Sequence, residues 1–259
     1  MNHNQLPQPT LHPLPIREIF ERLEQRIPSG QWWPAETPFE IIVGAVLTQN
    51  TAWTNVEYAL ENLRAHDALA PEAILNLSDE ALISAIRPAG YYNTKARYLR
   101  EVSQWFLKFQ DELGLTSSTE PGTEPSAENT NPLATAASHI ETAELRRKLL
   151  AVTGVGPETA DDILLYVFDR PVFIFDTYAR RMFLAAGYPI PATTASSYEK
   201  TRRFLEPVVE EAGLSVQEHV QLHGLIVDGG KVARQLGEQG WQQLLGLLPP
   251  SHNDATATP

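Results

Sequence analysis

A short glycine turn between two apolar segments constrains the fold of this chain more than any other feature. Residues 149–168 read LLAVTGVGPETADDILLYVF. Gly154 and Gly156 suit a turn that needs a positive φ or a close approach of the backbone, and Pro157 suits the first position of a helix. The stretch therefore predicts two helices joined by a tight hairpin.

Such a hairpin has two interpretations. The exposed amides of the turn, at the start of a helix, form a site for a phosphate oxygen and would hold a DNA backbone without reading its sequence. The alternative is a plain connection between two helices with a glycine at the end of the first. The turn alone leaves both open.

Apolar residues elsewhere recur at helical spacing, and almost no alternating strand pattern appears apart from RPVFIF at 170–175. The class is therefore all-α. Helices are expected from Thr37 or Pro38 to Thr48, after Ser78 as an N-cap, and from the YYNTKARYL segment to about Phe109. Further helices are expected over residues 16–26, 54–64, 71–76, 142–151, 157–168, 176–186, 196–212, 216–229 and 237–247.

Three segments are polar or of low complexity and predict disorder. They are the tail 1–13, the Ser/Thr/Glu/Pro/Ala-rich insertion 114–138 and the tail 250–259. The formal net charge is -12, and the span 111–144 holds seven acids without a lysine or arginine. The remainder is still slightly acidic, which counts against DNA binding because phosphate contacts are mostly electrostatic.

Composition excludes several classes of protein. The chain has no cysteine, so disulfides, thiolate metal sites and a cysteine-ligated iron–sulfur cluster are ruled out. No apolar run is long enough to span a bilayer, and the N-terminus lacks the pattern of a secretory signal. We therefore expect a cytoplasmic protein with no metal.

Several motifs in one order carry a family resemblance. They are FEIIVGAVLTQNTAW, IRPAGYYNTKARYL, the hairpin pattern LxxVxGVGPxTA, VFIFDTYARR and LHGLIVDGGK. Together they resemble the helix-hairpin-helix DNA glycosylases of the endonuclease III superfamily, over roughly residues 16–235. The segment WWP before FE, followed by LTQNT and an aromatic residue, is most similar to the 3-methyladenine DNA glycosylase III branch.

The resemblance implies two helical lobes with double-stranded DNA in the groove between them. A six-helix barrel would comprise residues 35–175, with the hairpin at 149–168, and the second lobe would comprise residues 14–34 and 176–249. It also implies a monomer associated with a bacterial nucleoid. The hairpin is a candidate site for a monovalent cation, and no other cofactor is expected.

Asp176 follows a run of phenylalanine and isoleucine, where a carboxylate is unfavourable unless it is paired or functional. From the residues alone it is either the N-cap of the next helix or a catalytic acid, and the two roles are compatible. The resemblance implies that Asp176 is catalytic. Ionised, it would stabilise positive charge on deoxyribose and orient water for attack, after the target base has been flipped out.

Glu158 lies where the resemblance implies a lysine in bifunctional members of the family. That amine forms a Schiff base with the sugar and cleaves the strand, and a carboxylate cannot form an imine. The resemblance therefore implies a monofunctional enzyme that leaves an abasic site. The alternative is a solvated acid in the first turn of a helix.

The base pocket is expected to contain Trp32, Trp33, Pro34, Trp53 and Glu158. Alkylated purines are cationic, and a cation is held well against electron-rich aromatic faces. The alternative for the tryptophans is anchoring of a loop to the core.

The expected DNA contacts include Gln49 and Asn50, one of which would fill the gap left by the flipped nucleotide, although both could be ordinary helix caps. The other expected contacts are Thr153, Gly154, Val155, Gly156, Thr159, Lys95 and Arg180. The resemblance also implies that four family cysteines are lost, with Trp241, Leu244, Leu245 and Leu247 packing in their place. His223 is expected to be a core histidine, and Leu225 stands where a pocket lysine is found in the branch.

The leading hypothesis is a base-excision DNA glycosylase that hydrolyses the N-glycosidic bond of alkylated purines such as 3-methyladenine, without lyase activity. Two alternatives stay open. One is a glycosylase for other lesions, such as oxidised or mismatched bases, and the other is a non-catalytic helix-hairpin-helix module that binds DNA or a protein.

Overall fold

The computed structural model describes residues 12–28, 33–115 and 131–248. All regular secondary structure in this part is helical, so the prediction of an all-α fold is confirmed. Residues 171–176, which include most of the strand-like RPVFIF segment, form neither helix nor strand. None of the described helices combines the length and hydropathy needed to cross a bilayer. Of the tails predicted to be disordered, 1–13 and 250–259, residues 1–11 and 250–259 lie outside the described residues.

The chain divides into two units, each with its own packing. The central unit comprises Trp33–Val172, and the terminal unit combines Met1–Trp32 with Phe173–Pro259. These junctions lie near the boundaries expected at 34/35 and 175/176.

The central unit contains six described helices of eight or more residues, which is the number expected for the barrel. They are α2 (Pro38–Thr48), α3 (Trp53–Ala65), α5 (Asp79–Ile86), α6 (Tyr92–Glu112), α8 (Thr142–Leu150) and α9 (Pro157–Tyr166). Shorter elements are α4 (Pro71–Asn76), α7 (Pro132–Ala136) and the 3-10 turns η1 (Arg87–Ala89) and η2 (Ala137–His139).

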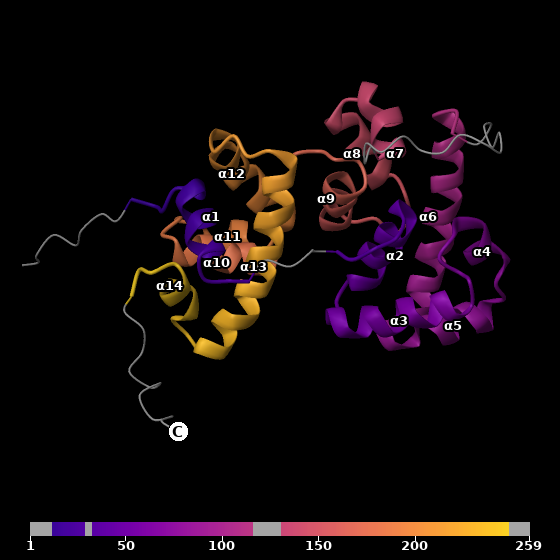
Figure 1. Cartoon of the computed structure of the whole chain (residues 1–259), viewed down its shortest axis with the longest axis horizontal. Coiled ribbons are helices and arrows are strands. Elements are labelled where there is room, and N and C mark those ends of the chain that lie inside the picture. The colour runs from indigo at the N-terminus through magenta and orange to yellow at the C-terminus, as the bar shows by residue number, and fades with distance from the viewer. Residues whose placement is uncertain (1–11, 29–32, 116–130, 249–259) are drawn as a thin grey trace, which may run out of the picture. The chain divides into compact units, whose positions relative to one another are not determined.

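Local sequence fixes two of these helix starts as expected. The Thr37 hydroxyl accepts a hydrogen bond from the Glu40 amide at 3.1 Å, and Ser78 Oγ accepts one from the Ala81 amide at 3.2 Å. Helix α2 is apolar on all sides and packs against α3, α6 and α9 (Figure 1). Its contact with α9 places α2 next to the second helix of the hairpin.

Residues 131–138, the last eight residues of the expected insertion, are structured, which corrects the prediction of disorder for this part of residues 114–138. Residues 131–139 form α7 and η2. Leu133 and Ala137 are buried, and the Asn131 side chain caps α7 by accepting from the Ala134 amide at 3.2 Å. Low-complexity composition concealed this short apolar anchor, because two buried residues decide its packing. Residues 116–130 lie outside the described part.

The terminal unit is built around α13 (Val216–Leu236), which contacts α1 (Ile16–Glu24), α10 (Thr177–Ala185) and α14 (Gly240–Leu244). Helices α11 (Ala192–Ala195) and α12 (Tyr198–Glu211) complete it. Its core includes an aromatic group in which the rings of Phe173 and Phe175 both pack against Phe183. Phe173 and Phe175 directly precede Asp176, and Phe183 lies in α10, the helix that follows Asp176.

Helix α13 continues seven residues past its expected end at Gly229, and the reason is packing. A Cβ on Gly230 would lie 2.1 Å from Cδ1 of Tyr178, and one on Gly229 would lie 3.2 Å from the Trp241 ring. These glycines therefore admit neighbouring aromatic rings and do not end the helix.

The C-terminal apolar residues pack only in part as expected. Trp241, Leu244 and Leu245 are buried in the terminal unit, with Trp241 against Gly229. Leu247 is exposed to 36%, so the expectation that it joins this packing is wrong. The chain turns out of the core at Gly246, which has a φ of +65°.

Candidate functional site

The glycine hairpin forms between α8 and α9, and only one of its glycines is conformationally required. Gly154 has a φ of +95°, and a Cβ there would lie 2.2 Å from Cγ of Tyr98. Gly156 has an ordinary φ of −84° and open space where its Cβ would be, so the expectation of a positive φ or close approach fails there. The turn thus packs against α6, with Gly154 in contact with the Tyr98 side chain.

A buried ion pair joins the two helices of the hairpin. Arg146 on α8 donates from Nε to Oδ1 of Asp161 on α9 at 2.6 Å, and from a terminal nitrogen to Oδ2 at 3.2 Å. The Asp161 side chain is fully buried, and that of Arg146 is exposed to 12%. This bidentate geometry fixes the angle between α8 and α9.

Gln49, the residue after α2, is bonded to the hairpin. Its Nε2 donates to the carbonyl of Gly154 at 2.8 Å and to Oγ1 of Thr159 at 3.0 Å. The next residue, Asn50, is exposed and has a φ of +55°. The structure therefore separates the two residues that the sequence could not distinguish: Gln49 holds the turn, and Asn50 faces solvent.

The expected phosphate-binding residues of the hairpin are not equally accessible. Thr153 is exposed, whereas the Val155 side chain is buried and its amide donates to the carbonyl of Val152 at 3.1 Å. The first bond of α9 runs from the Ala160 amide to the carbonyl of Gly156 at 2.8 Å. The amides that precede this bond point out of the helix end, as an anion site requires.

Glu158 is exposed in the first turn of α9. An acid at this place is favoured by the helix dipole. The position therefore matches the solvated first-turn acid weighed from the sequence, and it also presents a carboxylate where the resemblance implies an amine.

Three aromatic rings of the central unit form one group. The Trp33 ring lies 5.4 Å from Trp53, edge to face, and 5.0 Å from Tyr166. Trp33 is buried with a φ of +60°, and a Cβ on Gly44 would lie 3.1 Å from its indole nitrogen. Trp53 is only partly buried. Trp33 is thus packed inside the central unit, whereas the ring of Trp53 lies at the surface of that unit.

Each unit has a described hollow, of about 460 Å³ in the terminal unit and of about 430 Å³ in the central unit. The second lies in the central unit and has Pro34 and Trp53 in its wall, but neither Trp33 nor Glu158. Its lining is rich in acids and aromatic side chains: Pro34, Glu40, Trp53, Thr54, Glu57, Tyr58, Leu60, Glu61 and Arg64. Trp32 lies outside the described residues.

Lys95 is not available to DNA, which corrects its expected role as a backbone contact. Its ammonium is buried and donates to the carbonyls of Leu47 and Ala89, both at 2.8 Å. Burial also lowers the pKa of Lys95 below its ordinary value. The lysine ties the end of α2 to η1 and has a structural role.

Asp176 is the N-cap of α10 in the terminal unit. Its Oδ1 accepts from the Ala179 amide at 2.7 Å, and the side chain is partly buried. Phe173, Ile174 and Phe175, which precede it, are buried. The helix N-terminus favours the ionised carboxylate, so capping and an anionic catalytic role are compatible at this position.

Arg180, expected to contact DNA, is partly buried and donates to the carbonyl of Ala195. His223 is fully buried in α13, and burial lowers its pKa to about 3, so the ring is neutral at physiological pH. This environment agrees with a core histidine. Leu225 is likewise buried in α13.

Sequence reasoning missed three of these relationships: the Arg146–Asp161 pair, the contribution of Tyr166 and the two bonds of Gln49. A spacing of fifteen residues between Arg146 and Asp161, across a hairpin, was the only available signal for the first.

Comparison with known proteins decides the family. The model of the HhH-GPD superfamily of base excision DNA repair proteins matches residues 43–211, which include the C-terminal part of α2, the hairpin and Asp176. The chain belongs to this superfamily. The HhH-GPD chain is also 36% identical to a Methanocaldococcus jannaschii protein described as a candidate DNA repair glycosylase, over 82% of this chain and 86% of that protein.

Two further similarities agree with the assignment to the HhH-GPD superfamily. Endonuclease III of Sulfolobus acidocaldarius is 27% identical over 74% of this chain and 72% of its own length. The crystal structure of the H. pylori 3-methyladenine DNA glycosylase MagIII bound to 1,N6-ethenoadenine superposes with a TM-score of 0.62 at 29% identity, covering 84% of this chain and 98% of that one. The HhH-GPD chain is therefore a member of a DNA glycosylase family.

Proposed function

We propose that this HhH-GPD protein is a monofunctional DNA glycosylase that releases alkylated purines, such as 3-methyladenine, from duplex DNA. The observation that supports the absence of lyase activity most directly is Glu158. The hairpin segment 149–168 contains no lysine, and an exposed carboxylate occupies the first turn of α9. Without an amine there, the hairpin supplies no nucleophile for a Schiff base.

Asp176 carries the proposed hydrolysis. As an N-cap it accepts a hydrogen bond from the Ala179 amide at the start of α10, directly after buried apolar residues, and a helix N-terminus favours an anion. An anion in such a setting stabilises the positive charge that develops on the deoxyribose as the base departs, and it accepts a proton from the attacking water. An alkylated purine already carries a positive charge, so its departure needs no strong general acid.

The aromatic group supports a cationic base as the substrate. Trp53 presents a partly exposed ring that is braced by Trp33, which in turn packs on Tyr166. Electron-rich rings attract a cationic purine face to face. The similarity to MagIII, a 3-methyladenine DNA glycosylase of H. pylori, adds to this argument.

The deciding experiment is release of 3-methyladenine from methylated duplex DNA, followed by chromatography of the free base. Wild-type protein is expected to release the base and leave abasic sites that break only after alkali treatment. Asp176→Asn preserves the shape of the cap and is expected to lower the rate at least about a hundredfold while duplex binding persists.

Two controls make the result specific. Borohydride trapping of the wild-type reaction is expected to give no covalent adduct, and an adduct would show that some amine replaces the lysine. A panel of duplexes with 1,N6-ethenoadenine, an oxidised pyrimidine or a mismatch is assayed in parallel. Release of an oxidised pyrimidine or a mismatched base faster than release of 3-methyladenine would overturn the proposed substrate class. Binding of the duplexes without release of any base would indicate a binding module.

A further inference from the structure

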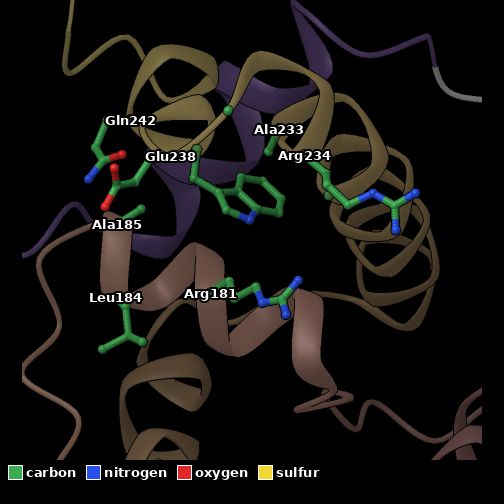
Figure 2. Close-up of a pocket in the computed structure, with 10 residues that line it drawn as sticks. Arg181, Leu184, Ala185, Ala233, Arg234, Glu238 and Gln242 are labelled. Carbon is green, nitrogen blue, oxygen red and sulfur yellow. The ribbon is translucent and has the colours of Figure 1, made fainter. Parts of the chain in front are cut away.

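The terminal unit has a hollow of about 460 Å³ among α10, α13 and α14. Figure 2 shows its lining, which comprises Arg181, Leu184, Ala185, Gly230, Ala233, Arg234, Gly237, Glu238, Trp241 and Gln242. The indole of Trp241 is buried to all but 8%, and Leu184 is exposed to 47%. The hollow therefore combines an apolar floor with charged side chains at its rim.

Two arginines from different helices meet at this hollow. Arg181 comes from α10 and Arg234 from α13, and both are exposed. Among the residues that the structure describes, neither guanidinium makes a hydrogen bond or an ion pair. Other arginines of the described part do pair with carboxylates, namely Arg17, Arg22, Arg64, Arg100, Arg146, Arg147 and Arg202.

The chain has a net charge of -12, and acids outnumber basic residues by 32 to 20. Two like charges facing one hollow repel each other unless an anion lies between them. The planar guanidinium donates in a fork that matches the oxygens of a phosphate. The hollow is therefore built for an anionic oxygen group.

Glu238 narrows the class of anion. Figure 2 shows Glu238 with Gln242 on one side of the pocket and the guanidinium of Arg234 on the other. A carboxylate in the same hollow repels a phosphate monoester or free phosphate, which carries about −1.5 to −2 charges at neutral pH, more than a singly charged phosphodiester. The single charge of a DNA backbone phosphate fits two arginines and one acid best.

We propose that Arg181 and Arg234 form a clamp for a backbone phosphate of DNA outside the target nucleotide, with Trp241 and Leu184 as the apolar surface beneath. The clamp rests on the proposed function, because it presumes that the chain acts on DNA. It adds a contact from α10 and α13 that neither the hairpin nor Asp176 supplies. Contacts of this kind position an enzyme and carry no sequence information.

The test measures binding of undamaged duplex DNA by fluorescence anisotropy over a range of salt concentrations. Arg181→Ala and Arg234→Ala are each expected to weaken binding and to reduce the slope of log K against log salt by about one. The double variant is expected to lose about two. Release of 3-methyladenine at saturating DNA is expected to change by less than about twofold, since the clamp does not touch the reacting atoms.

The matched control is Arg203→Ala, which removes an exposed arginine of α12 in the same unit and is expected to leave the salt slope unchanged. Arg181→Lys with Arg234→Lys keeps both charges and is expected to keep most of the slope. Circular dichroism and the unfolding midpoint check that each variant folds. If an alanine variant does not fold, the lysine variant and Arg181→Gln replace it.

Distinct results separate the possible failures. An unchanged slope in the double variant, with wild type still excising, overturns the clamp and leaves the glycosylase proposal standing. A wild type that neither binds nor excises overturns the proposed function itself. A third result would show that the site binds a free anion and that the assignment to DNA is wrong. In that case inorganic phosphate, added at constant ionic strength, protects wild type but not the double variant against thermal unfolding. The slope of log K against log salt for DNA binding is then the same in both proteins.

Discussion

Arg146 and Asp161 join the two helices of the hairpin through a pair of hydrogen bonds of 2.6 and 3.2 Å that is almost entirely shielded from water. The bonds run from α8 to α9 and leave the turn between them, at Thr153–Gly156, at the surface. The turn is thereby presented between two helices that a bidentate ion pair holds together.

Breaking this pair on one side is expected to be strongly destabilising. Asp161→Ala leaves a nearly buried guanidinium without its carboxylate, which costs about 3–5 kcal/mol. Urea unfolding followed by circular dichroism measures the effect. Lys108→Ala, which removes an exposed pair with Glu112 at 3.9 Å, serves as the control and is expected to change stability by less than about 1 kcal/mol. Equal effects of the two variants would show that the hairpin pair is ordinary surface electrostatics.

Gln49 is expected to act on the hairpin and not only on DNA. Gln49→Ala removes two hydrogen bonds, to Gly154 and Thr159, and is expected to cost about 1–3 kcal/mol because both acceptors lie in a partly buried place. Hydrogen exchange of the hairpin amides reports the local loosening. Asn50→Ala, at the exposed neighbouring residue, is expected to leave exchange unchanged, and faster exchange in both variants would contradict the assignment.

The two aromatic residues of the proposed base pocket are expected to respond differently to truncation. Trp33→Ala empties a buried site between Gly44, Trp53 and Tyr166 and is expected to cost about 3–5 kcal/mol. Trp53→Ala, at a partly exposed ring, is expected to cost less stability and to raise KM or lower kcat for 3-methyladenine release. Trp53→Phe keeps an aromatic face and is expected to restore most activity. Full activity of Trp53→Ala would place the base elsewhere.

His223 is expected to make the protein sensitive to acid. Its native pKa of about 3 lies below the ordinary value of 6.5, so between these values the unfolded chain binds a proton that the folded chain does not. Stability therefore falls as the pH drops through this window. By about pH 4 the contribution reaches roughly 3 kcal/mol, since each pKa unit corresponds to about 1.4 kcal/mol.

Unfolding measured at several pH values tests this, with His223→Gln flattening the acid limb relative to wild type. His219, whose pKa is also lowered by burial, contributes in the same direction. His66→Gln, at an exposed position, controls for general effects of histidine removal. Parallel curves for His223→Gln and wild type would show that the buried ring does not titrate in this way.

Local patterns were sufficient to predict the helices, because capping and apolar spacing act within a few residues. Thr37, Ser78 and Asp176 all cap helices as expected. The predicted helix over residues 216–229 ends too early, because Gly229 and Gly230 make room for rings from other elements and the helix continues through them. The helical turn α7 was missed because its anchor is two buried residues in a low-complexity segment.

The candidate site was predicted by residue type but not by orientation. The motifs and their order predicted the hairpin and Asp176 as parts of the site. They could not show that Lys95 points inward to two carbonyls or that Gln49 is bonded to the turn. Both facts depend on how α2 lies against η1 and the hairpin, which is a matter of tertiary packing.

The different settings of the two hairpin glycines define where the turn can be redesigned. A side chain at Gly154 would collide with Tyr98 in a left-handed backbone, whereas Gly156 has an ordinary φ and open space beside it. Thr153 is also exposed. To raise the affinity of this acidic protein for nucleic acid, a lysine would be introduced at Thr153 or Gly156. Gly154 would be left unchanged, because the turn packs against Tyr98 at this residue.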